Sequence, residues 1–96
     1  MAVEVRIPTI LRKHTGGARS VEGDGSTVRE VIDKIDAQHP GFHAAIVSEG
    51  GELHRFINVY LNDEDIRFLG SLETPVSDGD TLSILPAVAG GAPARR

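Results

Sequence analysis

Hydrophobic and polar residues alternate in three short stretches of this chain, the pattern of a β-strand with one buried face. These stretches lie at residues 3–7, 55–61 and 81–85. Pro86 ends the third, because proline cannot donate a backbone hydrogen bond. The inward side chains that this alternation predicts are Val5, Ile7, Ile57, Val59, Leu82 and Ile84.

One stretch, residues 27–38, has the periodicity of a helix instead. Thr27 and Glu30 have the spacing of a capping box at its start. Pro40 ends it, since proline disfavours helix in the residue before it. The side chains predicted to face the sheet recur every three or four residues and are Val28, Val31, Ile32 and Ile35.

The remaining segments have weaker patterns. Gly16 and Gly17 predict a hairpin turn at residues 14–17, followed by a short strand near 18–22. Residues 42–47 suggest a helical turn, and Ile66 with Phe68 suggests a short strand. The resulting order is strand, strand, helix, strand, short strand, strand. We therefore predict the α+β class and the β-grasp (ubiquitin-like) fold, a mixed sheet with one main helix packed across it. Its first and last strands should lie side by side and parallel at the centre.

Composition restricts the function. The 96 residues form one domain with a formal charge of -4, and four aromatic residues provide no stacking platform. We expect no nucleic-acid partner and no membrane partner, because both favour a basic face. The chain has no cysteine, which excludes disulfides, thiolate nucleophiles and cysteine-ligated metals. It also lacks an apolar run of roughly 20 residues and a signal peptide, so we expect a cytoplasmic protein.

Candidate catalytic groups are sparse. His39 and His43 have the spacing of a helical metal pair, but Pro40 and Gly41 lie between them, which favours exposed loop histidines. The acidic run 63–65 lacks the periodicity of a calcium loop and is typical of a solvated turn. We therefore expect no metal site, no bound cofactor and no enzymatic activity of the chain itself.

The segment after Pro86 is more informative. It consists of small residues, namely Ala87, Val88, Ala89, Gly90 and Gly91. Five extended residues span roughly 17 Å, enough to thread a narrow channel in another protein. Glycines at the tip have no side chain to block such a channel. The pattern suits a carboxylate delivered on a thin arm, although a Gly-Gly pair alone also suits an ordinary frayed terminus.

Several motifs decide between these interpretations. The turn 78–80, the last strand and the segment Leu85 to Gly91 resemble the ending of the ThiS/MoaD family of sulfur carriers. Asn62 resembles the asparagine at the end of a family strand. The segments 7–12, 54–56 and 62–65 resemble its actinobacterial CysO-type branch, which is used in cysteine biosynthesis. The resemblance covers Val3 to Gly91.

The resemblance implies a reaction cycle. An E1-like enzyme, related to the ubiquitin-activating enzymes, adenylates the carboxylate of Gly91 with ATP. A sulfur source then displaces AMP and leaves a thiocarboxylate, which donates its sulfur to a biosynthetic acceptor enzyme. The acceptor pathway stays open: cysteine by branch, or thiamine, molybdopterin or a secondary metabolite. A protein modifier conjugated through Gly91 and a plain interaction module are the alternative functions.

The chain departs from the family pattern in one respect, because Ala92-Pro93-Ala94-Arg95-Arg96 follows Gly91. We therefore predict a precursor with a domain at 1–86, an arm at 87–91 and a cleavable tail at 92–96. Cleavage between Gly91 and Ala92 would free the carboxylate, and the CysO-type branch suggests a JAMM-type zinc metalloprotease for this step. A cloning remnant is the alternative origin, but the tail matches no common tag.

Partner docking should use the outer face of the sheet. Phe56, Tyr60 and Leu85 are predicted to point away from the core on neighbouring strands. Exposed apolar clusters on small domains commonly contact partners. The other possibility is that a loop covers them.

Overall fold

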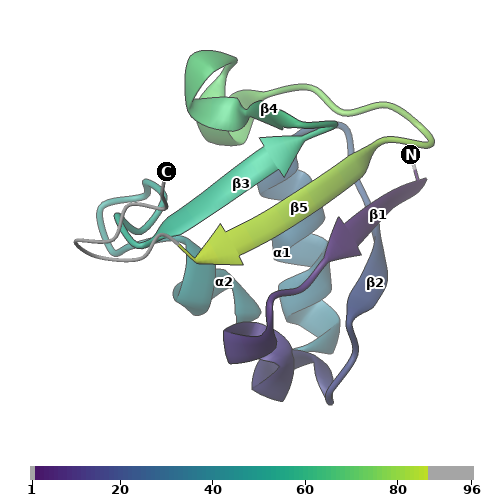
Figure 1. Cartoon of the computed structure of the whole chain (residues 1–96), viewed down its shortest axis with the longest axis vertical. Helices are drawn as coiled ribbons and strands as arrows, with labels where there is room; N and C mark the ends of the chain where they lie inside the picture. Colours follow the sequence, from purple (N-terminus) through teal and green to yellow (C-terminus); the bar gives the residue numbers. More distant parts are fainter. Residues whose placement is uncertain (1, 87–96) are drawn as a thin grey trace, which may run out of the picture.

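A five-stranded mixed sheet organises residues 2–86, which are the residues that this computed structural model describes (Figure 1). The strand order is β2-β1-β5-β3-β4. The parallel β1–β5 pair joins the first and last strands at the centre of the sheet, as predicted, and the other pairs are antiparallel. The strands are β1 (Ala2–Arg6), β2 (Ser20–Asp24), β3 (Ile57–Leu61), β4 (Glu64–Asp65) and β5 (Thr81–Pro86).

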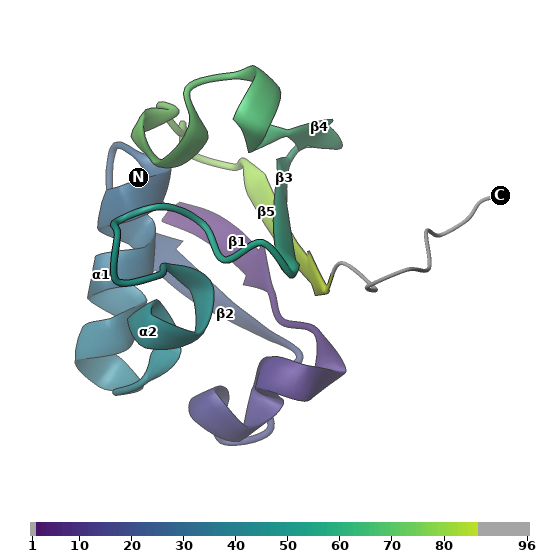
Figure 2. The same cartoon turned by 90° about the vertical axis from the view of Figure 1, so that its left-hand side faces the viewer.

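Two α-helices, α1 (Val28–Gln38) and α2 (Phe42–Ile46), lie on one face of this sheet, whereas neither covers the opposite face (Figure 2). Thr27 begins α1 as predicted, and its hydroxyl accepts a hydrogen bond from the Glu30 N–H at 3.2 Å. The Glu30 carboxylate accepts from the N–H and hydroxyl of Ser26, both at 2.9 Å, which lowers the pKa of Glu30. The helix start is therefore fixed by two side chains.

The core lies between α1 and the sheet. Each of the ten side chains predicted for it is buried, six from the strands and four from the helix. The periods of two and 3.6 therefore identified the correct faces. The core also takes in side chains from segments without a clear pattern, chiefly Phe42, Ile46, Ile66, Leu72 and Val76.

The predicted hairpin turn at residues 14–17 is wrong. The connection between β1 and β2 instead runs from Ile7 to Arg19 and contains a 3-10 helix, η1 (Thr9–Thr15). Gly16 ends that helix in the left-handed region at φ 67°, a conformation that glycine adopts at little cost. Because the connection is longer than expected, the second strand begins at Ser20 rather than near residue 18.

The short strand predicted at Ile66 and Phe68 is also wrong. β4 ends at Asp65, and residues Ile66–Phe68 form a 3-10 helix, η2. The Asp65 carboxylate accepts a hydrogen bond from the Arg67 N–H at 2.9 Å, which bends the chain out of the sheet. Ile66 therefore enters the core, whereas Phe68 is 86% exposed. A second one-turn helix, η3 (Ser71–Glu73), follows.

A side-chain clip fixes the beginning of β5 against the end of β3. The Asn62 amide donates to the Asp80 carboxylate and accepts from the Thr81 N–H, both at 3.0 Å. The Ser77 N–H donates to the other oxygen of Asp80 at 2.7 Å. The bonds from Asn62 and Ser77 hold the pKa of Asp80 below its usual value. The clip sets the register of the strand that leads into the arm.

Candidate functional site

The arm begins where β5 ends. Pro86 is the last residue of β5 and lies opposite Ile57, the first residue of β3. The predicted arm 87–91, the cleavage position between Gly91 and Ala92, and the tail 92–96 lie outside the described residues. The observable part of the site is therefore the surface from which the arm departs.

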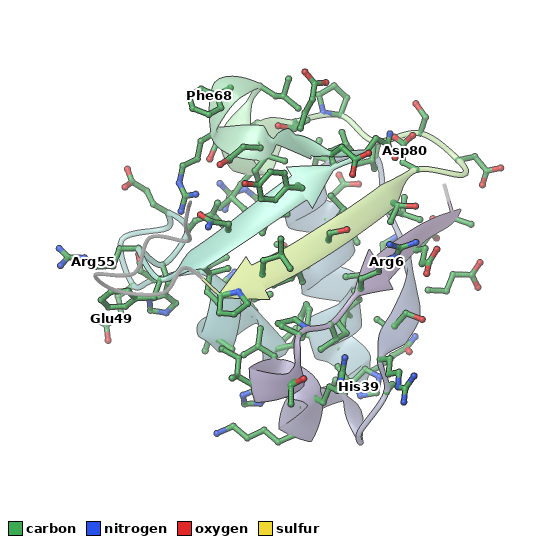
Figure 3. The ribbon with its side chains drawn as sticks, in the orientation of Figure 1. Arg6, His39, Glu49, Arg55, Phe68 and Asp80 are labelled. Carbon is green, nitrogen blue, oxygen red and sulfur yellow. The ribbon has the colours of Figure 1, made fainter. Side chains whose placement is uncertain are left out.

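Three strands present one row of side chains on the face that the α-helices leave uncovered. Arg6 of β1 is in register with Ser83 of β5, which is in turn opposite Tyr60 of β3. Leu85, two residues along β5, points to the same side and lies opposite Asn58. Figure 3 labels Arg6 of β1 and, above it in the view, Asp80 just before the start of β5.

A hollow of about 460 Å³ lies over this row. Its side walls are long side chains, and its centre is the small Ser83. The structure therefore brings Tyr60 and Leu85, both predicted for docking, to one concave surface, with Leu85 45% exposed. The residues that line the hollow include Arg6, Pro8, Arg12, Tyr60, Ser83 and Leu85.

Phe56, the third predicted docking residue, does not line this hollow. The strand predicted from residue 55 begins only at Ile57, so Phe56 lies in the turn before β3. Its ring is 53% exposed, with the Arg55 guanidinium 6.0 Å from the ring centre. Phe56 directly precedes Ile57, which is paired with Pro86 at the end of β5, without being part of the hollow.

Arg67 braces β3, the strand paired with β5, a role that sequence reasoning missed. Its guanidinium donates to the Ile57 carbonyl at 2.7 Å and to the Asn58 side chain at 2.6 Å. It thereby ties η2 to the start of β3. The sequence carries no signal for this contact, because it depends on η2, which was predicted as strand.

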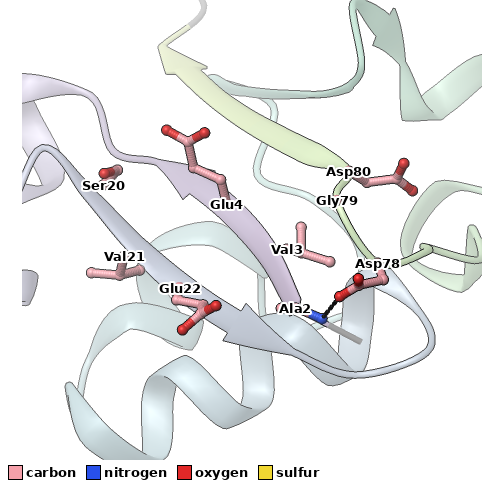
Figure 4. Close-up of a pocket in the computed structure, with 9 residues that line it drawn as sticks. All are labelled: Ala2, Val3, Glu4, Ser20, Val21, Glu22, Asp78, Gly79 and Asp80. Atoms are coloured by element: carbon pink, nitrogen blue, oxygen red, sulfur yellow. Dashed lines mark hydrogen bonds between the residues drawn. The ribbon is translucent and has the colours of Figure 1, made fainter.

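The surface next to the hollow that Leu85 lines, over β1 and β2, is acidic. A second hollow lies over the antiparallel β1–β2 pair and the turn before β5 (Figure 4). The Asp78 carboxylate accepts a hydrogen bond there from the Ala2 N–H at 3.0 Å. The charged side chains that line this hollow are all acidic: Glu4, Glu22, Asp78 and Asp80.

The histidines are not gathered into a site. His39 follows the last turn of α1, and His43 lies in α2 rather than in the predicted loop. Nε2 of His43 lies 3.6 Å from a carboxylate oxygen of Asp33. Within residues 2–86 no cluster of three or more histidine, aspartate or glutamate side chains is arranged to hold a metal ion. No helix in this part of the chain is long and apolar enough to cross a membrane.

Comparison with known proteins identifies the family. The sequence model of the ThiS family matches residues 5–91. The chain belongs to the ThiS family. The sulfur carrier protein CysO of Mycobacterium tuberculosis is 53% identical to this chain over 93 residues, covering 95% of this chain and all of the relative.

Solved structures of relatives support the same family and fold. CysO in the BexX/CysO complex of Amycolatopsis orientalis is 64% identical, with a TM-score of 0.88 over 94% of this chain and all of that one. The small archaeal modifier protein 1 of Methanosarcina acetivorans is 31% identical, with a TM-score of 0.79 over 94% and 96% of the two chains. The β-grasp fold and the resemblance to the CysO-type branch of the ThiS family are confirmed.

Proposed function

We propose that this ThiS-family chain is a sulfur carrier whose working group is the carboxylate of Gly91. The observation that carries the proposal is the reach of the family match, which ends at Gly91, at the tip of a segment that starts from the central strand β5. The 53% identity to a sulfur carrier protein along nearly the whole chain supports the same role. Because one structural relative is named a modifier protein, conjugation through Gly91 is a second outcome that the test below distinguishes.

The chemistry belongs to partner enzymes. An E1-like enzyme binds ATP, and an oxygen of the Gly91 carboxylate attacks the α-phosphorus, so that pyrophosphate leaves. Hydrosulfide then attacks the acyl carbon and AMP leaves, which forms the thiocarboxylate. This sulfur is a nucleophile that a biosynthetic acceptor enzyme uses, with cysteine as the expected product. The carrier contributes docking and reach, and no catalytic group.

The carboxylate exists only after residues 92–96 are removed. A JAMM-type zinc metalloprotease that hydrolyses the Gly91–Ala92 bond fits this requirement. The family match stops at Gly91, which leaves these five residues beyond it and supports their removal. The domain at 1–86 would then hold an arm of residues 87–91 with a free end.

A mass measurement tests the proposal. Residues 1–91 are incubated with ATP, sulfide and a purified E1-like enzyme that thiocarboxylates a CysO-type carrier. The expected intact mass is that of the chain with one oxygen replaced by sulfur, and omission of ATP should abolish the change. An unchanged mass would contradict the sulfur-carrier function. Isopeptide-linked products with lysines of other proteins, without the sulfur-containing species, would favour the modifier.

The docking prediction has its own test. Leu85→Glu replaces an apolar side chain of the hollow with a carboxylate, so we expect the rate of thiocarboxylate formation to fall roughly tenfold or more, since the partner loses an apolar contact and the added carboxylate must be desolvated on docking. Leu69→Glu is the matched control, because Leu69 has a similar exposure of 42% and does not line the hollow. Equal rates for wild type and Leu85→Glu would show that the activating enzyme docks elsewhere.

A further inference from the structure

We propose that the hollow along the end of β5 binds an acidic, apolar segment of the activating enzyme, and that Arg6 and Arg12 recognise its carboxylates. This inference rests on the proposed sulfur-carrier function and specifies the chemistry of the partner surface. It assigns a role to two arginines that the apolar docking prediction left out.

The shape of the hollow follows from the register of three strands. Neighbouring strands are about 4.8 Å apart, so Arg6 and Tyr60 stand roughly 10 Å apart, with Ser83 between them. Because serine is small, the space above it stays open between two long side chains. Leu85 and Pro8 supply apolar surface at the end nearer the arm. The gap is wide enough to accept a side chain of a partner.

The guanidinium groups at this hollow are available to a ligand. Nε of Arg12 donates to the Ile7 carbonyl at 3.1 Å, which holds the side chain at the edge of the hollow. Its other two nitrogens form no hydrogen bond or ion pair with residues 2–86. Arg6 has one contact, 3.5 Å to Glu4, with both side chains more than half exposed. A fixed guanidinium with free nitrogens is well suited to bind a carboxylate in a bidentate manner.

The charge of the hollow differs from that of the molecule. The hollow contains two arginines and one carboxylate, that of the exposed Asp63, whereas the whole chain has a formal charge of -4. The four charged residues that line the neighbouring hollow over β1 and β2 are acidic, and one of them, Glu4, lies 3.5 Å from Arg6 (Figure 4). Along β1 and β5 the charge of this face therefore changes within a few residues, from an acidic end near Ala2 and Asp80 to a basic end nearer Pro86. An acidic partner surface would attract that end and repel the other, which orients the arm toward the active site during encounter.

The same charges argue against other occupants. The tail of this chain ends in Arg95 and Arg96, so its charge does not complement the two arginines. A nucleic acid or an anionic membrane would meet the net negative charge and the acidic end of the sheet. A protein segment that carries aspartate or glutamate next to an aliphatic or aromatic side chain matches both the apolar surface and the arginines.

The test measures association of residues 1–91 with the purified E1-like enzyme without ATP, at low and at high salt. Arg6→Glu and Arg12→Glu should each slow association roughly tenfold at low salt and lose most of the salt dependence. Lys13→Glu is the matched control: it makes the same charge change next to Arg12 but does not line the hollow, so its rate should stay within about twofold of wild type. Melting curves confirm that each variant is folded, and Arg6→Glu suffices if Arg12→Glu does not fold.

A steric variant tests the hollow without a charge. Ser83→Leu fills the space between Arg6 and Tyr60, so it should weaken binding while the salt dependence of association stays that of wild type. Wild-type rates for Arg6→Glu and Ser83→Leu, with normal thiocarboxylation of the wild-type chain, would overturn this inference and leave the sulfur-carrier function intact. Absence of both binding and thiocarboxylation in the wild-type chain would instead overturn the proposed function and this inference with it.

Discussion

Ile32→Ala is expected to lower the free energy of unfolding by about 2–4 kcal/mol, whereas Ile10→Ala should change it by less than about 0.5 kcal/mol. The two substitutions remove the same atoms from different surroundings. Ile32 is 2% exposed in the core beneath α1, and Ile10 is 56% exposed on η1. The difference between the two losses of unfolding free energy therefore measures the effect of burial at a constant residue type.

The expected loss of stability comes from the cavity that Ile32→Ala leaves in the core. Ile32 belongs to the four-residue face of α1 that packs on the sheet, and the neighbouring Val28, Val31 and Ile35 are themselves buried. Capping at Thr27 and the paired strands hold both walls in place, so the space left by the deleted atoms can collapse only in part. Urea unfolding monitored by circular dichroism measures both variants. A loss below about 1 kcal/mol for Ile32→Ala with an unchanged m-value would show that α1 packs less tightly than described.

Those parts of the fold that rest on local signals were predictable from the sequence. The helix had a cap at Thr27 and four apolar residues on one face, and the three main strands alternated between core and solvent. The parallel pairing of β1 and β5 followed from element order and the β-grasp resemblance. In each case several local preferences agree with the tertiary packing, which is the condition for reliable inference from sequence.

The incorrect predictions concern segments whose conformation is set by distant contacts. Ile66 and Phe68 have strand spacing, but the Asp65 carboxylate caps a 3-10 turn there, and Ile66 enters the core through that turn. Residues Thr9–Thr15 carry no helical stripe, yet they fold as η1. That error had a consequence for the site, because Arg12 reaches the hollow from η1 and was not considered.

In the candidate site, too, sequence patterns placed some residues correctly and missed others. Alternation on two strands sufficed to place Tyr60 and Leu85 on the outer face, since a period of two fixes the side of a sheet. Phe56 was assigned to a strand that begins one residue later. The hydrogen bond from Arg67 to Ile57 joins residues ten positions apart, and the turn that brings them together has no periodic sequence pattern. The identity of the reactive residue, Gly91, came from the family motif rather than from periodicity.

The uncut chain of residues 1–96 should form no thiocarboxylate, whereas residues 1–91 should react at once under the same conditions. In the uncut chain the Gly91 carbonyl belongs to the amide bond with Ala92, and an amide presents no carboxylate oxygen to attack ATP. The effect is therefore close to complete rather than graded. Cleavage also removes Arg95 and Arg96, which takes the formal charge from -4 to -6 and makes the product visible on a native gel. Thiocarboxylate on the uncut chain would disprove the precursor prediction.

Gly91→Val in the same two chains tests whether the tip of the arm must pass through a narrow channel in the partner enzymes. A bare backbone at the tip can thread a narrow active site and adopt angles closed to other residues, so a branched side chain there should block both cleavage of residues 1–96 and activation of residues 1–91. Ala87→Val is the matched control, because it adds a similar branched side chain at the root of the arm, next to the natural Val88. Intact mass and native gels report both steps. If Gly91→Val and Ala87→Val reacted equally, the enzymes would not require a thin tip, and the two glycines would have to serve the arm in some way other than by threading.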